Sequence, residues 1–73
     1  MKTLKVQYKG KIIHAKFTIE EKGMGLRDYY IHHKNGYSFY IFRKSEGVWR
    51  IAYGDLDEDL KESIIAALSE RFG

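Results

Sequence analysis

Three histidines, His14, His32 and His33, are the residues of this chain best suited to chemistry. Imidazole binds metals and moves protons near neutral pH. His32 and His33 are neighbours in a predicted strand, so their side chains point to opposite faces of a sheet and cannot share a metal. His14 and His32 could lie on one face, but two histidines without a neighbouring carboxylate make a weak ligand set. We therefore expect no metal site.

The possible nucleophiles do not form a recognisable catalytic pattern. The chain has no cysteine, which excludes disulfides, Cys-based zinc sites and thiol catalysis. Ser38, Ser45 and Ser63 lack a paired histidine and acid. The Gly-Met-Gly of residues 23–25 is not followed directly by a helix, as a phosphate-binding loop would be. We expect no catalytic residues, no cofactor and no enzymatic activity.

Charge is unevenly distributed along the 73 residues. Residues 1–54 contain eleven lysines and arginines and four acids, a net charge of +7, whereas residues 55–73 contain two and six, a net charge of −4. The lysine-rich N-terminal stretch has no apolar run, so it predicts neither a signal peptide nor a membrane span. We expect a cytoplasmic location and no membrane partner.

The acidic C-terminal segment predicts an amphipathic helix over about residues 56–72. One apolar stripe recurs at helical spacing, formed by Leu56, Leu60, Ile64, Ala67, Leu68 and Phe72. Asp55 and Glu58 fit an N-cap and its N3 partner, and Gly73 stands where a C-terminal cap would. Helix electrostatics therefore explain the acidic run better than metal binding does.

Glycines divide the rest of the chain into five predicted strands, at about 2–8, 11–20, 28–33, 37–44 and 48–53. Residues 21–27 contain two glycines and predict a longer connection, which we expect to be the most mobile internal segment. The chain is predicted to be a single α+β domain over residues 1–73. Its expected architecture is a five-stranded antiparallel β-meander, open or curled toward a small barrel, with one C-terminal amphipathic α-helix packed on one face.

The register of the last hairpin decides which side chains of its strands face the helix, because a slip of one residue reverses both faces. A two-residue turn would put Glu46 at positive φ and Arg43 opposite Arg50. A three-residue loop, with a bulge at Gly47, avoids both problems. The sequence therefore favours the bulged loop.

The Asn-Gly pair of residues 35–36 leaves two registers open for the preceding hairpin. Asn-Gly is a strong signal for a two-residue turn, which would pair Asp28 with Arg43. A bulged loop instead aligns Ile31 with Phe39 and keeps one apolar face continuous. We favour the bulged register for that reason.

In these registers one face of the sheet packs against the helix and the other is uncovered. On the packed face we expect contacts between the helix and the sheet, joining Leu60, Ile64 and Leu68 to Phe39, Trp49 and Ile51. The uncovered face has no acid before Glu20 and combines basic with aromatic side chains. It forms the candidate binding surface, made of Lys16, Tyr30, His32, Tyr40, Phe42, Lys44 and Arg50.

Three roles are compatible with a basic and aromatic sheet face. Cross-strand aromatic pairs or closure into a barrel would make it purely structural. Contiguous exposed aromatics mark interaction surfaces, so the leading functional hypothesis is an interaction module that binds an unknown protein partner or self-associates as a homodimer. Aromatics among lysines and arginines also suit single-stranded nucleic acid, the alternative, although no ribonucleoprotein-type aromatic motif occurs at its expected spacing.

Overall fold

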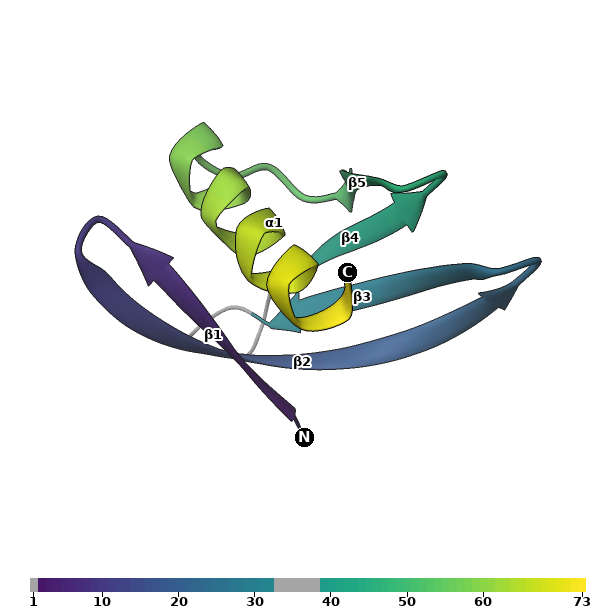
Figure 1. Cartoon of the computed structure of the whole chain (residues 1–73), viewed down its shortest axis with the longest axis horizontal. Helices are drawn as coiled ribbons and strands as arrows, with labels where there is room; N and C mark the ends of the chain where they lie inside the picture. The colour runs from purple at the N-terminus through teal and green to yellow at the C-terminus, as the bar shows by residue number, and fades with distance from the viewer. Residues whose placement is uncertain (1, 33–38) are drawn as a thin grey trace.

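The computed structural model describes residues 2–32 and 39–73. It consists of one antiparallel sheet and one helix, α1 (Glu58–Phe72) (Figure 1). Five strands are hydrogen-bonded in chain order: β1 (Lys2–Tyr8), β2 (Lys11–Gly23), β3 (Leu26–His32), β4 (Phe39–Ser45) and β5 (Val48–Tyr53). The predicted α+β meander is confirmed. The sheet is open, with β1 and β5 at its edges, so it does not close into a barrel.

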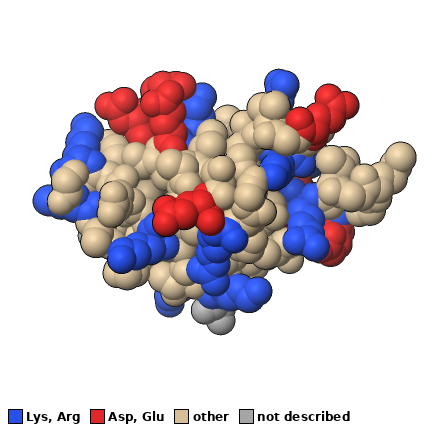
Figure 2. Space-filling view, viewed as in Figure 1, with Lys and Arg blue, Asp and Glu red and all other residues tan. Residues whose placement is uncertain are grey.

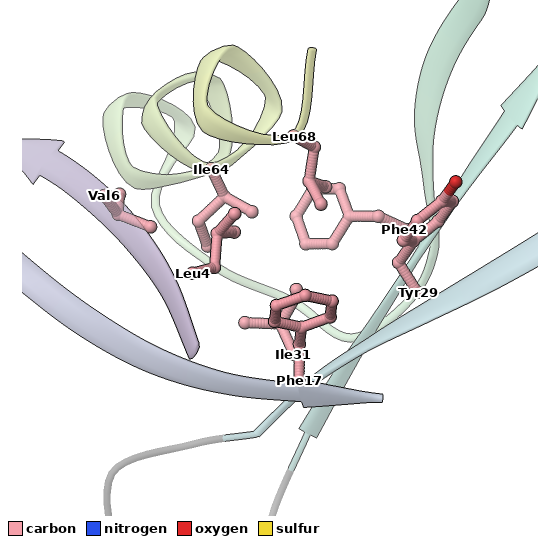
Figure 3. Packing of buried hydrophobic residues seen from close by; sticks show 8 residues of the cluster. All are labelled: Leu4, Val6, Phe17, Tyr29, Ile31, Phe42, Ile64 and Leu68. Carbon is pink, nitrogen blue, oxygen red and sulfur yellow. The ribbon is translucent and has the colours of Figure 1, made fainter. Parts of the chain in front are cut away.

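The hydrophobic core lies between the helix and one face of the sheet. Figure 1 shows that the sheet curves around α1, with β1 on one side of the helix and β4 and β5 on the other. Eight apolar side chains are at most 4% exposed, namely Leu4, Val6, Phe17, Tyr29, Ile31, Phe42, Ile64 and Leu68 (Figure 3). Leu60 of α1 and Trp49 and Ile51 of β5 are partly buried against this cluster, as predicted for the contact between the helix and the sheet.

The ends of α1 are capped by Asp57 and Gly73. The side chain of Asp57 accepts a hydrogen bond from the backbone N–H of Leu60 at 3.3 Å. The predicted cap at Asp55 is wrong, and Glu58 is the first helical residue rather than the N3 partner of a capping box. The same Asp57 carboxylate also accepts a hydrogen bond from the Tyr8 hydroxyl on β1 at 3.2 Å, a tertiary contact that a cap at Asp55 would not make.

The predicted C-terminal cap is confirmed. Gly73 has a φ of 83°, and its N–H donates to the Ser69 carbonyl oxygen at 2.8 Å. Glycine adopts this left-handed conformation without steric cost, which is why it so often follows the last helical turn.

Residues 21–27 do not form the predicted long connection. β2 continues to Gly23 and β3 begins at Leu26, so the turn between them contains only Met24 and Gly25. A bulge near the end of β2 adjusts the register before this turn. Most of these residues are paired in the sheet, and the expected mobility of the segment stays a prediction for amide exchange to test.

The turns after β1, β2 and β4 share one geometry. Each has a non-glycine residue followed by glycine, both at positive φ: Lys9-Gly10 (48° and 76°), Met24-Gly25 (54° and 79°) and Glu46-Gly47 (53° and 78°). Two residues at positive φ are typical of the type I′ turn, whose twist matches that of the strands it joins. Lysine, methionine and glutamate are unusual in its first position, which normally holds asparagine, aspartate or glycine.

Replacing Glu46 by asparagine is expected to stabilise the protein by about 0.5–1 kcal/mol, a part of the roughly 1–2 kcal/mol that a left-handed conformation costs most residues. The urea midpoint, read by circular dichroism, should rise. Glu46→Gln serves as the control, because it removes the same charge without the turn preference of asparagine. An equal rise in both variants, or none in Glu46→Asn, would contradict a type I′ turn at this position.

The turn at Glu46 contains two residues, which gives β4 and β5 the register that was not favoured from the sequence. Ser45 pairs with Val48, and Arg43 lies opposite Arg50. The prediction of a three-residue loop with a bulge at residue 47 is therefore wrong.

The register between β3 and β4 is also the disfavoured one. Asp28 lies opposite Arg43, so the bulged register that aligned Ile31 with Phe39 is wrong. The described pairing fits a two-residue turn, but the turn itself falls within residues 33–38, outside the described part of the chain.

This change of register turns β4 over. Phe42 enters the core, where it is 0% exposed, and Tyr40 and Lys44 share its side of the strand. Phe39 and Ile41 move to the face away from α1, which we call the outer face. The predicted contact between Phe39 and the helix is therefore wrong.

Candidate binding face of the sheet

The structure keeps part of the predicted binding surface together. The residues that stay on the outer face are Lys16, Tyr30, His32 and Arg50. Lys16 and Arg50 are exposed, whereas Tyr30 and His32 are half-buried.

The other predicted surface residues lie on the helix side, which corrects the prediction for each of them. Phe42 is a core residue. Tyr40 packs against the core, and its ring lies so close to Gly54 that a Cβ there would come within 2.5 Å of it. Lys44 has its ammonium 5.8 Å from the centre of the Trp49 ring and donates a hydrogen bond to the backbone carbonyl oxygen of the C-terminal residue.

A strip of aromatic and aliphatic side chains crosses β3, β4 and β5 on the outer face. We call it the outer strip; it consists of Tyr30, His32, Phe39, Ile41 and Tyr53. The ring centre of Phe39 lies 5.5 Å from that of Tyr30 and 5.6 Å from that of Tyr53. The His32 ring follows at 6.4 Å from Phe39. Phe39 and Tyr53 remain 36% and 59% exposed, so the strip presents aromatic surface to solvent.

Sequence reasoning missed Phe39, Ile41 and Tyr53 as members of the outer face. The signal for the first two was present, because Asn-Gly at residues 35–36 is the strongest short-range mark of a two-residue turn. A two-residue turn there requires Asp28 opposite Arg43, which is the pairing observed between β3 and β4. Tyr53 had no such signal, since it reaches the outer face through an irregularity in the β4–β5 ladder next to Ile41.

A row of four charged residues crosses the outer face beside the outer strip: Glu20, Asp28, Arg43 and Arg50, on β2 to β5 in that order. The Arg43 guanidinium donates to both carboxylate oxygens of Asp28, from Nε at 2.7 Å and from Nη2 at 3.0 Å. Glu20 is paired with Lys22 at 2.8 Å. No acid precedes Glu20 on this face, as expected, but Asp28 lies on the face as a second acid that the sequence analysis did not include.

Asp28 is buried although it lies on the uncovered face. It is only 2% exposed, while the side chain of Arg43 above it is 40% exposed. The hydrogen bonds from Arg43 hold the pKa of the Asp28 carboxyl below its ordinary value, against the opposing effect of burial. A buried carboxylate of this kind is stable only with its partner in place.

The ion pair predicts a specific dependence of stability on pH. The folded-state pKa of Asp28 lies below the unfolded value of about 3.9. The pair therefore contributes fully above the unfolded pKa, and its contribution is lost as the pH falls toward the folded value. We expect the free energy of unfolding to fall more steeply below about pH 5 in the wild type than in Asp28→Asn.

Glu46→Gln is the matched control for this pH series, because Glu46 makes no ion pair within the described part of the chain. Its curve should run parallel to that of the wild type. Urea midpoints measured from pH 7 to about pH 2.5 give the comparison, since acid loss of native ion pairs falls within that range. Parallel curves for wild type and Asp28→Asn would contradict the pair.

Arg50 is the unbalanced member of the charged row. It lies directly opposite Arg43, is exposed, and makes no ion pair with any described residue. Like charges directly opposite each other on neighbouring strands destabilise a sheet. The buried carboxylate of Asp28 is already bound by Arg43, so within the described residues no carboxylate balances the charge of Arg50.

The described residues contain no group of three or more histidine, cysteine, aspartate or glutamate side chains that could hold a metal ion. In the same part of the chain no helix is long and apolar enough to cross a membrane. No family model, curated protein or solved structure matches the chain.

Proposed function

We propose that this chain is a non-enzymatic interaction module that binds a second copy of itself through the outer face. The proposal rests on the complementarity of this face to itself. A contact between two identical copies of one surface is the commonest form of protein assembly, and its partners are related by a two-fold axis.

Complementarity is clearest in the charged row. A two-fold axis parallel to the strands, running along the seam between β3 and β4, brings β2 of one copy over β5 of the other and β3 over β4. Glu20 then faces Arg50 of the second copy, and Asp28 faces Arg43. The arginine that lacks an acid in the monomer thereby gains one. Such pairs fix the register of an interface more than they raise its affinity.

The outer strip fits the same axis. Tyr30 of one copy lies over Ile41 of the other, and His32 lies over Phe39. The part of the outer strip on β3 and β4 therefore meets itself, Tyr53 lies over Thr18 of β2, and the charged row meets the charged row. Two sheets packed face to face normally keep their strands within about 30° of each other, which this arrangement satisfies.

Single-stranded nucleic acid is less well supported by the corrected face. Of the predicted cations, Lys44 lies on the helix side, and Arg43, which replaces it, is already bound to Asp28. Asp28 and Glu20 also lie beside the outer strip, where they would repel phosphates.

The size of the face predicts a weak dimer. About this axis only the four strands β2 to β5 overlap; at a spacing of about 4.8 Å they are roughly 19 Å wide, and seven residues at about 3.3 Å are roughly 23 Å long. The overlapping part of the sheet has an area on the order of 440 Å², against about 800 Å² per partner in a standard interface. We therefore expect reversible association, which requires sedimentation measurements up to high protein concentration.

Sedimentation equilibrium of charge-reversal variants tests the proposal. Arg50→Glu and Glu20→Arg should each weaken the dimer about tenfold or more, because each puts like charges face to face. The double variant restores the opposite charges and should return the affinity to near that of the wild type. Arg27→Glu is the matched control: Arg27 lies on the opposite face, paired with Glu21 at 2.7 Å, and should leave the dimer unchanged.

A wild type that stays monomeric at all concentrations would contradict the proposal, as would a double variant no better than the single ones. A monomer that binds a homopolymeric oligonucleotide, with an affinity that falls steeply as salt rises, would assign the outer face to single-stranded nucleic acid instead.

A further inference from the structure

A second surface lies at the other side of the fold, between the edge strand β1 and α1. A cleft of about 830 Å³ separates them. Its strand wall comprises residues of β1, and its helix wall carries Asp59, Glu62, Ser63, Ala66 and Glu70. Figure 2 shows acidic side chains gathered over the N-terminal part of α1, next to basic side chains at the β1–β2 turn.

The strand wall of this cleft has unpaired backbone groups. β1 is hydrogen-bonded only to β2. Tyr8 and Lys11 close a two-residue turn, so they form a hydrogen-bonded pair, and such pairs alternate with non-bonded ones along an antiparallel ladder. The residues whose N–H and C=O point away from β2 are Thr3, Lys5 and Gln7, and the Thr3 carbonyl oxygen among them is bound by Arg71 of α1.

A contact from the helix shows where this edge points. The Arg71 guanidinium of α1 donates to the Thr3 carbonyl oxygen at 2.7 Å. At the other end of the strand the Tyr8 hydroxyl reaches Asp57, the N-cap of the helix. The helix is thus tied to both ends of β1, and the backbone of Lys5 and Gln7 lies free between the two ties.

The two edges of the sheet are not equivalent. β5 is short, and its ladder with β4 is irregular near Tyr53. Irregularities of this kind hinder the pairing of a further strand with an edge. The register of β1 with β2 is continuous from Lys2 to Tyr8, so the β1 edge keeps the regular geometry that another strand needs.

We propose that this cleft binds an extended peptide, which pairs antiparallel with the free edge of β1. In strand addition of this kind backbone hydrogen bonds supply affinity and alternate side chains supply specificity. The added strand would lie about 4.8 Å from β1 and bond the free groups of Lys5 and Gln7. The side chains of Ser63 and Ala66 on the helix wall are small, so side chains of the bound peptide fit between its backbone and α1.

The charges of the two walls specify the side chains of the peptide. Every second residue of an added strand points toward α1, whose wall carries three acids, Asp59, Glu62 and Glu70, against one cation, Arg71, which is bound to the Thr3 carbonyl oxygen. Lysine or arginine is favoured at those positions. The intervening residues point to the side of Lys5, where uncharged residues are favoured. A second copy of β1 is disfavoured as the occupant, because an antiparallel pair centred on Lys5 brings identical lysines together.

Two seven-residue peptides test the charge preference by isothermal titration. One has lysine at alternate positions and threonine between; the other has glutamate in place of lysine. The lysine peptide should bind about tenfold or more tightly than the glutamate peptide. Glu62→Gln/Glu70→Gln should remove most of this difference, whereas Glu46→Gln, on a turn away from the cleft, should preserve it.

N-methylation of the lysine peptide tests strand addition itself. In an antiparallel pair the peptide residues that bond Lys5 and Gln7 carry their side chains on the Lys5 side, so they are the threonines. Methylation of the threonine amides should abolish binding, and methylation of the lysine amides should be tolerated. The reverse result, or an equal effect of both, would overturn the proposal.

This inference does not rest on the proposed dimer. Arg50→Glu, which should dissociate the dimer, should bind the lysine peptide as the wild type does. If the lysine peptide binds only when the dimer dissociates, the β1 edge is occupied by a second copy of the chain in the dimer. That result would overturn the peptide proposal.

Discussion

Phe42→Ala is expected to lower the free energy of unfolding by about 3–5 kcal/mol, the range for removing a buried aromatic side chain. The Phe42 ring is fully buried, between Tyr29 on β3 and Ile51 on β5, beneath Leu68 (Figure 3). A small domain has on the order of 5 kcal/mol in total, so this variant should be close to unfolded at room temperature. Urea denaturation followed by circular dichroism measures the change.

Phe39→Ala is the matched comparison, because it removes the same side chain from the outer face. Its ring is partly exposed and contacts Tyr30 and Tyr53, so the expected loss is about 1 kcal/mol. If Phe42→Ala fails to fold, Phe42→Leu and Phe39→Leu can be compared instead, because each should destabilise the protein less than the alanine variant. A larger loss at Phe39 than at Phe42 would contradict the observed register of β4.

Ile64→Ala is expected to cost about 2–5 kcal/mol, since it leaves a cavity at the centre of the helix–sheet contact. Ile64 is 3% exposed and lies beside Leu4 and Val6 of β1 (Figure 3). The urea midpoint should fall sharply. Glu62→Ala, at an exposed helix position, should leave the midpoint nearly unchanged. An unchanged midpoint for Ile64→Ala would show that α1 does not pack on β1.

The architecture could be predicted because several local signals agreed. Alternating apolar residues and glycines marked the strands, and the spacing of Leu60, Ile64 and Leu68 marked the helix face. These signals depend only on residues close together in the sequence, so they predict the elements without knowledge of tertiary contacts.

Turn preference pointed in opposite directions at the two hairpins: Asn-Gly at residues 35–36 favoured the register observed for β3 and β4, whereas Glu46 counted against the register observed for β4 and β5. Glutamate at positive φ counted against a two-residue turn at Glu46, at a cost of roughly 1–2 kcal/mol. Full burial of a phenylalanine side chain such as Phe42 is worth about 1.5–3 kcal/mol, and this register also joins Asp28 to Arg43. The burial of Phe42 and the pairing of Asp28 with Arg43 are thus comparable in magnitude to the strain in the turn, and they can be assessed only when β3, β4 and β5 are considered together.

The two errors of register explain which site residues were predicted correctly. One error turned β4 over, which exchanged Phe39 and Ile41 for Tyr40 and Phe42. The second error cancelled the first for β5, so Arg50 stayed on the outer face as predicted.

The register of β4 determines which of its side chains lie in the core and which on the outer face. Cross-strand nuclear Overhauser effects measure this register directly. We expect strong contacts between backbone protons of Tyr29 and Phe42 and of Ile31 and Tyr40, which are opposite each other in the ladder. Contacts from Tyr29 to Ile41 would instead put Phe42 on the outer face, and would contradict both the core described here and the surface proposed to self-associate.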